Sequence, residues 1–421
     1  MPVWLIPMIY TLASLIAAAV LPRVEYALAG TANLGVSASA ALTVLSSIAS
    51  GMMALTGIVF SIAFVMLQFS AITYSPRFAA RFARDPMLFH ALGMFFATFT
   101  FALAAAAWTD RDGSGRVLPF SAFLSVGLLL ASLFAFGLLM RRLADLQITN
   151  TLRYIGNQGR EVIRHTFAAA AVRKVADASA SAAPPPTQIL RHDGAPRYVE
   201  RYDIPALVAL ARNAGACIEL NCAVGDMVLD GTVMLRVLGG TRALPEKPLR
   251  RAVRLGPDRT FEQDPKYPLR LLVDVAIKAL SPAINDPTTA VQALDQIEDL
   301  LRRLARQDLD IGRIGDGQGV LRLVFPTPSW DDYLALAFDE IRVFGGSSIQ
   351  VQRRLRSALT GLEDMLAADP RGASTHCYLQ HVDAAIERSS FDELDRQSAR
   401  QGDPQGLGLT RQGGRGAAAP P

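Results

Sequence analysis

The first third of the sequence has almost no charged side chains. Residues 1–140 hold only ten of the chain's 42 Lys and Arg and 38 Asp and Glu residues, and four long apolar runs within them hold none of these types. Helices in the core of a soluble protein seldom run past about 14 residues without a charge. This absence therefore excludes a chain that is water-soluble along its whole length.

The four apolar runs cover residues 3–21, 42–69, 89–108 and 118–140. A bilayer core of about 30 Å needs roughly 20 helical residues, and unpaired backbone groups are costly in lipid. We therefore predict a transmembrane domain of four helices over residues 1–140. The alanines at 17–19 suggest a signal-peptide cleavage region, but no Lys or Arg precedes the first run and Pro7 lies inside it. We expect an uncleaved anchor.

Arginines near the ends of the runs predict the orientation. Those in the second loop and after the fourth run are Arg77, Arg81, Arg84, Arg141, Arg142, Arg153, Arg160 and Arg164, whereas the other two loops hold Arg23, Arg111 and Arg116. Basic loops stay in the cytoplasm, so we expect an inner-membrane protein with both termini cytoplasmic. The net charge of +4 is small for this length and makes no separate case for nucleic acid.

Small and weakly polar residues recur at three- and four-residue steps along the second run; the candidates are Ser50, Ala54, Gly57, Ser61 and Gln68. Such a face allows close helix packing, and it could instead line the pore of a homo-oligomer. Because Asp, Glu, Lys and Arg are missing from the runs, a proton relay or a strongly ion-coupled transporter is disfavoured.

The charged remainder predicts a juxtamembrane helix over 141–176, a proline-rich linker over 177–187, a cytoplasmic domain over 188–400 and a disordered tail over 401–421. The domain should be mixed α/β and mostly helical, with a small β-module over 198–240. Later helices are predicted from Ser329, from a Ser347–Gln350 capping box, and over 375–399.

A tight joint between two helices is the best candidate for a ligand site. Residues 269–280 have a helical apolar face, Pro282 ends that helix, and Asp286 and Pro287 suit the N-cap and first position of the next. The polar candidates at this joint are Ser281, Asn285, Asp286 and Thr288, and Arg259, Asp264 and Arg270 are expected to line the same cleft. Helix capping alone is the alternative explanation.

Signatures of catalysis are missing. The sequence has no Walker A loop, no Rossmann glycine pattern, no G-x-S-x-G and no H-E-x-x-H. Its three cysteines do not form a CxxC zinc pattern, and Cys377 with His381 lacks an evident third ligand. We expect no enzyme activity, no metal and no cofactor.

Two strings resemble a known family. RLLVDVAIKALSPAINDPTTA at 270–290 and FSIAFVMLQFSAITYSPR at 60–77 are similar to the family of bacterial membrane proteins called domain of unknown function 2254, over roughly residues 1–365. The resemblance implies an inner-membrane protein with a cytoplasmic region and implies no activity. We expect a non-enzymatic membrane protein whose cytoplasmic domain binds a small molecule or protein. The alternatives are a homo-oligomeric channel gated by that domain and, with less support, a membrane-bound enzyme.

Overall fold

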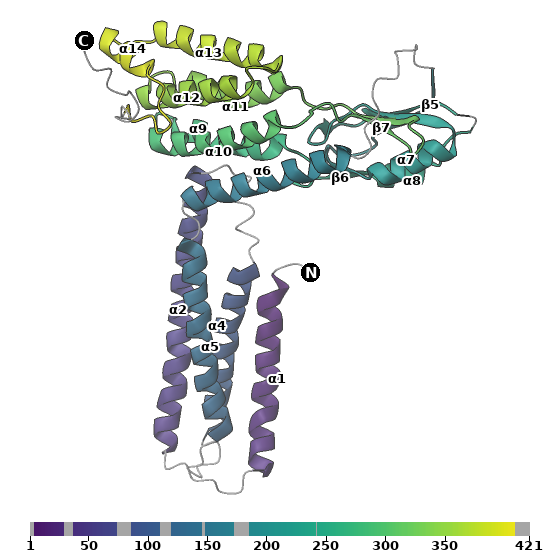
Figure 1. Ribbon diagram of the computed structural model, residues 1–421. Helices are drawn as coiled ribbons and strands as arrows, with labels where there is room; N and C mark the ends of the chain where they lie inside the picture. Colours follow the sequence, from purple (N-terminus) through teal and green to yellow (C-terminus); the bar gives the residue numbers. More distant parts are fainter. Residues whose placement is uncertain are drawn as a thin grey trace, which may run out of the picture. The chain divides into compact units, whose positions relative to one another are not determined.

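The computed structural model describes residues 4–28, 37–73, 86–109, 119–144, 148–171, 185–240 and 242–408. The chain divides into two compact units, Met1–Gln147 and Ile148–Pro421. The first unit contains helices α1 (Leu5–Leu28), α2 (Ala38–Thr73), α4 (Pro86–Trp108) and α5 (Pro119–Ala144) (Figure 1). Four spans in them are long and apolar enough to cross a membrane: Leu5–Glu25, Ala38–Val65, Pro86–Trp108 and Phe120–Arg141. The prediction of four membrane helices is confirmed.

Helix α4 holds the core of the first unit because α1, α2 and α5 all contact it. Its Phe95 and Phe101 are fully buried. On α2, the residues that face this core recur at helical spacing; they include Leu45, Ile48, Met52, Thr56 and Val59. Packing of apolar side chains therefore uses one face of α2 and leaves the opposite face open.

The membrane-type spans include Arg23, Glu25, His90 and Arg141. Of these, only His90 lies inside one of the four apolar runs, and our expectation overlooked it. Helix α1 continues through Pro22 to Leu28, so its span includes Arg23 and Glu25, and His90 lies near the start of α4. Glu25 accepts hydrogen bonds from the backbone N–H groups of Phe120, at 2.7 Å, and Ser121, at 3.2 Å. It thereby caps the start of α5, which explains how a buried carboxylate is tolerated there.

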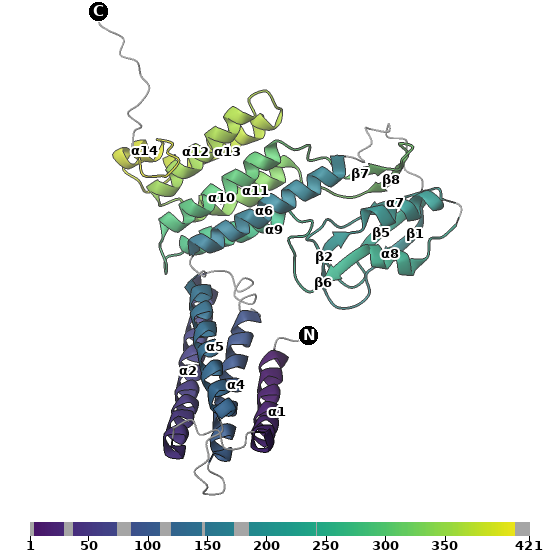
Figure 2. The same ribbon diagram turned by 60° about the horizontal axis from the view of Figure 1, so that its bottom comes forward.

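The second unit combines a helical layer with a β-module (Figure 2). The helical layer consists of α6 (Ile148–Ala171), α9 (Lys266–Ala279), α10 (Pro287–Ala305), α11 (Trp330–Phe344), α12 (Ile349–Met365), α13 (Arg371–Glu387) and α14 (Glu393–Ala399). Its core is formed by leucines and alanines of α9, α10 and α12 that are completely buried. The prediction of a mostly helical domain is confirmed.

The predicted juxtamembrane segment 141–176 is not a separate element. Its first residues belong to α5, and α6 packs its apolar face on α9 and α10 as part of the helical layer. Gly159 permits this approach, since a Cβ there would lie 2.6 Å from Leu300 Cδ1. The amphipathic pattern of α6 thus reflects burial of its apolar face against α9 and α10.

Two sheets form the β-module. One has the order β1-β5-β3-β8-β7 and the other β4-β2-β6. The strands are β1 (Pro186–Arg191), β2 (Arg197–Tyr202), β3 (Ala216–Leu220), β4 (Met227–Val228), β5 (Val233–Gly239), β6 (Val253–Gly256), β7 (Arg313–Gly315) and β8 (Leu321–Val324), and helices α7 (Ile204–Asn213) and α8 (Glu246–Ala252) accompany them. All ladders are antiparallel except β3–β8, so this module draws on residues 186–324 and is larger than the predicted 198–240.

Several boundaries differ from the sequence predictions. Strand β1 begins at Pro186, inside the predicted linker, whose residues 177–184 lie outside the described part. Ser348, not Ser347, caps α12, and the single helix predicted over 375–399 is divided into α13 and α14. Residues 402–408 of the predicted tail form an ordered loop, in which Asp403 Oδ1 accepts a hydrogen bond from the Gln405 N–H group.

Candidate functional site

The joint between α9 and α10 is built largely by its own hydrogen bonds. The Ser281 hydroxyl donates to the carbonyl of Lys278 at 2.7 Å. The Asp286 carboxylate accepts from the backbone N–H of Thr289 at 3.0 Å and from its hydroxyl at 2.6 Å, and Pro287 follows at the first helical position. The predicted N-cap is confirmed, and the side chains of Ser281 and Asp286 both serve the backbone of the turn.

Asn285 adopts a backbone conformation that few side chains tolerate. Its φ of 48° is the only positive φ of a non-glycine residue among the described residues. Asn visits this left-handed region more readily than most residues. Its N–H donates to the Ser281 carbonyl at 2.8 Å, which closes the turn. The side chains of Asn285 and Thr288 are exposed, so the joint presents them to solvent.

A buried ion pair lies before the start of α9. The guanidinium of Arg259 donates to Asp264 Oδ2 from Nη2 at 2.6 Å and from Nε at 2.9 Å, and Asp264 is 1% exposed. Burial raises the pKa of the Asp264 carboxyl, while Arg259 opposes that rise. The ring of Tyr267 lies 5.3 Å from the guanidinium carbon of Arg259. Arg259 therefore contacts both the carboxylate of Asp264 and the ring of Tyr267.

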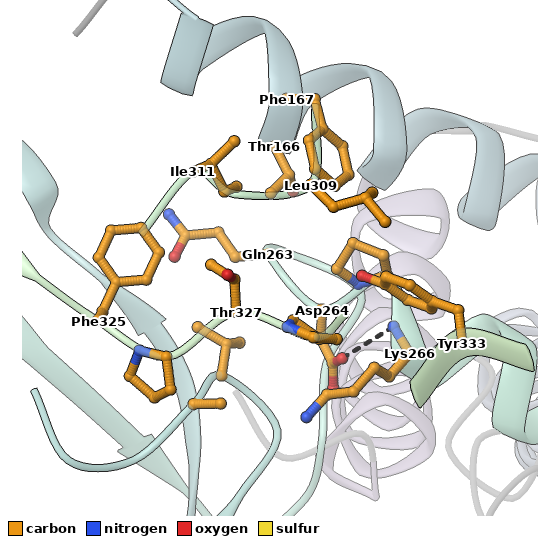
Figure 3. A pocket seen from close by; sticks show the side chains of 15 residues that line it. Thr166, Phe167, Gln263, Asp264, Lys266, Leu309, Ile311, Phe325, Thr327 and Tyr333 are labelled. Atoms are coloured by element: carbon orange, nitrogen blue, oxygen red, sulfur yellow. Dashed lines mark hydrogen bonds between the residues drawn. The ribbon is translucent and has the colours of Figure 1, made fainter. Parts of the chain in front are cut away.

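Asp264 also lines a cavity of about 50 Å³ where the helical layer meets the β-module (Figure 3). Thr166 and Phe167 reach it from α6, Phe325 and Thr327 from the segment after β8, and Tyr333 from α11. The Thr166 hydroxyl is buried and has no hydrogen-bond partner. A buried polar atom of this kind calls for a water or ligand, and the volume accommodates one or two waters.

The predicted ligand residues do not form one cleft. Asp264 and Arg259 lie before the first residue of α9, whereas the joint follows its last, and 14 helical residues span about 20 Å. Arg270 lies between them and forms ion pairs with Asp274, at 2.7 Å, and Glu340, at 3.1 Å. The structure brings Arg259 and Asp264 together and leaves both Arg270 and the joint elsewhere.

The small-residue face of α2 is open in the described chain. Ser50, Ala54, Gly57, Ser61 and Gln68 are all exposed, and a Cβ at Gly57 would meet nothing within 4 Å. Next to this face, Ser47 and Gly51 help to line a groove of about 460 Å³ between α2 and α5. These residues therefore make no packing face with the described helices of the same chain.

Metal ligands do not gather anywhere in the described ranges, where no group of three or more His, Cys, Asp and Glu is placed to hold an ion. His376 Nδ1 is hydrogen-bonded to Glu363 Oε1 at 2.7 Å. Cys217 is half-buried on β3, and burial raises its pKa to about 11. A raised pKa disfavours the reactive thiolate at this position.

The cavity residues Thr166, Phe325, Thr327 and Tyr333 were not among the sequence candidates. They come from segments up to 167 positions apart in the sequence, counted from Thr166 to Tyr333. Thr166 lies on α6, whose sequence is amphipathic, and Tyr333 lies on the apolar stripe of α11. Nothing in the sequence indicates that these stripes meet at Asp264, so only the tertiary fold defines the cavity.

Comparisons with known proteins agree with this architecture. Uncharacterised proteins of Mycobacterium bovis and Mycobacterium tuberculosis are each 28% identical to this chain over 372 residues, which cover 84% of this chain and 69% of the relative. No solved structure matches the chain. The family model described as "Predicted membrane protein (DUF2254)" matches residues 2–361. The chain therefore belongs to the DUF2254 family of predicted membrane proteins.

Proposed function

We propose that this chain is a non-enzymatic inner-membrane protein whose second unit lies in the cytoplasm and binds a small polar ligand. The arginine-rich loops support this orientation. The ligand would enter the cavity beside Asp264 and hydrogen-bond to the Thr166 hydroxyl. We prefer this place to the joint, because the Ser281 and Asp286 side chains already bond to the turn itself.

The observation that carries this proposal is the unpartnered hydroxyl of Thr166 at a cavity between two layers. Ligand sites favour such boundaries. Since the cavity is small, the ligand that it takes must be small as well. Thr166 belongs to α6, the helix that follows the membrane helices in the sequence, so a change in its packing would pass along the chain toward α5.

Thermal unfolding of the detergent-solubilised full chain tests the ligand. The probe is the small-molecule fraction of a bacterial cytosol, compared with buffer. We expect it to raise the unfolding midpoint of the wild type and of Thr288→Val, a control at the exposed joint, and to have little effect on Thr166→Val. A gain that survives Thr166→Val but disappears in Asn285→Ala/Asp286→Ala would place the ligand at the joint. No gain in the wild type would refute the proposal.

A homo-oligomeric channel is the second candidate, and the open face of α2 favours it. Weakly polar residues are better placed along a pore or a helix interface than against lipid tails. We expect conductance in liposomes to be lost in Gly57→Leu and retained in Gly127→Leu, because a Cβ at Gly127 on α5 likewise meets nothing. Equal conductance in both variants, or none in the wild type, would reject the channel.

A further inference from the structure

Several helix boundaries meet at one end of the helical layer. Helix α6 runs parallel to α10: Thr149 Oγ1 lies 3.5 Å from Gln292 Oε1, and Arg160 is paired with Asp299 at 2.7 Å. Helix α12 has the same direction as α10. Near the start of α12, Arg354 Nε donates to Asp295 Oδ1 of α10 at 2.8 Å, and further along both helices Gly361 lies beside Arg302. The helices α6, α10 and α12 therefore all begin at the same end (Figure 2).

Helices α9 and α11 finish at that end. They too are parallel, because Tyr333 and Asp264 line one cavity near their first turns and Arg270 is paired with Glu340 further along. Residues 280–286 and 345–348 connect these helices to α10 and α12. The loop 402–408 packs alongside, with Gly406 against Gln350. We call these two connectors, the loop, Val343, Phe344 and the first two turns of α6 the joint end.

Apart from Arg153, the joint end exposes apolar and uncharged side chains. Val343 is 64% exposed, Phe344 51% and Leu407 55%. On the connector 280–286, Pro282, Ala283 and Asn285 are exposed as well. Its carboxylates Asp286 and Asp403 accept hydrogen bonds from neighbouring backbone N–H groups. Large apolar side chains left in water lose the stabilisation that burial would give, so several of them at one end of the layer indicate a contact surface.

The sequence indicates what covers this surface. Only residues 145–147 separate α5, which is apolar enough to cross a membrane, from the first residue of α6. A chain of that length spans at most about 14 Å. An exposed basic residue, Arg153, lies on the second turn of α6. Apolar side chains beside a basic one suit the boundary between lipid headgroups and acyl chains.

We propose that the joint end docks on the lipid headgroup layer of the membrane, with Val343, Phe344 and Leu407 as its apolar contacts. The connector 280–286 then has a role beyond helix capping: it keeps this face small and uncharged, so that the neighbouring apolar side chains reach the lipid. This contact lies at the opposite end of α9 from the Asp264 cavity.

Lipid quenching of a fluorescent label tests the proposal in the full chain reconstituted into liposomes of zwitterionic and anionic phospholipid. In a Cys377→Ser background, which removes the one exposed native cysteine, a polarity-sensitive dye is attached to Phe344→Cys or Leu407→Cys. The matched control is Val320→Cys, an apolar side chain of the β-module that is 45% exposed. Unsubstituted background protein gives the signal from Cys217 and Cys222, which is subtracted.

We expect the dyes at positions 344 and 407 to shift their emission to the blue and to be quenched several-fold more than the dye at 320 by lipids brominated near the headgroup. Equal quenching at all three positions would overturn the proposal. A blue shift without quenching would also overturn it, because protein, either a partner or a second copy, would then cover the surface. None of these readings depends on a cytosolic ligand, so they stand apart from the test of the Asp264 cavity.

Discussion

A methyl group at Gly225 would overlap Oδ2 of Asp264 and lie 2.9 Å from Nη2 of Arg259. The backbone of Gly225 has φ of 90°, which glycine alone adopts without strain. Its N–H donates to the Val199 carbonyl at 2.8 Å, so the loop between β3 and β4 is tied to β2. The buried ion pair and this glycine thus fix how the β-module meets the start of α9.

Gly225→Ala should destabilise the second unit by about 2–4 kcal/mol, since backbone strain adds to the displacement of a buried ion pair. Gly231→Ala is the matched control: its φ is 76° but its Cβ would meet nothing, so a loss of only about 1–2 kcal/mol is expected. Denaturant unfolding of both variants in detergent measures the difference. Similar losses of stability in the two variants would mean that the close approach of Gly225 to Asp264 does not contribute to stability.

Asn285 should be replaceable by glycine and not by a β-branched residue. We expect Asn285→Gly to change the free energy of unfolding by less than about 1 kcal/mol, because glycine accepts φ of 48°. Asn285→Val should cost about 1–3 kcal/mol, and Asp286→Ala about 1 kcal/mol through loss of the N-cap. The same denaturant titration reports all three. A large loss for Asn285→Gly would show that the amide side chain itself is needed.

Arg354 links α10 and α12 from a nearly buried position. Its side chain is 4% exposed and donates to Asp295, at 2.8 Å, and Glu298, at 2.6 Å. Arg354→Ala should cost about 3–5 kcal/mol, because it leaves the carboxylate of Glu298 with less compensation in a buried place. Arg303→Ala removes the more exposed pair with Asp299 and should cost about 0–1 kcal/mol. If Arg354→Ala and Arg303→Ala lose the same stability, the ion pairs of Arg354 do not stabilise the helical layer more than an exposed pair does.

The connector between α12 and α13 should respond to acid. The Arg371 guanidinium and backbone N–H donate to Asp369 and lower its pKa to about 2, against an ordinary value of about 3.9. Because the folded pKa is the lower one, the carboxylate's contribution to stability is present above about pH 4 and is lost as pH falls toward about 2. The unfolding midpoint of Asp369→Asn should lie below that of the wild type at pH 6, by a smaller margin at pH 3, and approach it near pH 2. Asp364→Asn, at an exposed position on α12, is the control; an Asp369 difference as large near pH 2 as at pH 6 would contradict this assignment.

Local signals in the sequence predicted local structure well. The N-cap at Asp286 and the helix start at Ser329 are confirmed, because each depends on a few adjacent residues. Contacts between distant segments could not be predicted in this way. The stripe on α6 indicated a helix but not its partners, α9 and α10. Arg259 and Asp264 were expected to line one cleft with the joint; they lie together, but at the other end of α9. Their union with Thr166, Phe325 and Tyr333 depends on the packing of four separate elements.

Paired topology reporters give the most direct test of the central claim, that α1 to α5 cross the membrane and the second unit is cytoplasmic. Green fluorescent protein or alkaline phosphatase is fused after Gly408, with fusions after residue 113, in the loop between α4 and α5, as the opposite control. We predict a fluorescent protein and an inactive phosphatase after Gly408, and the reverse after residue 113. An active phosphatase after Gly408, with no fluorescence there, would contradict the account.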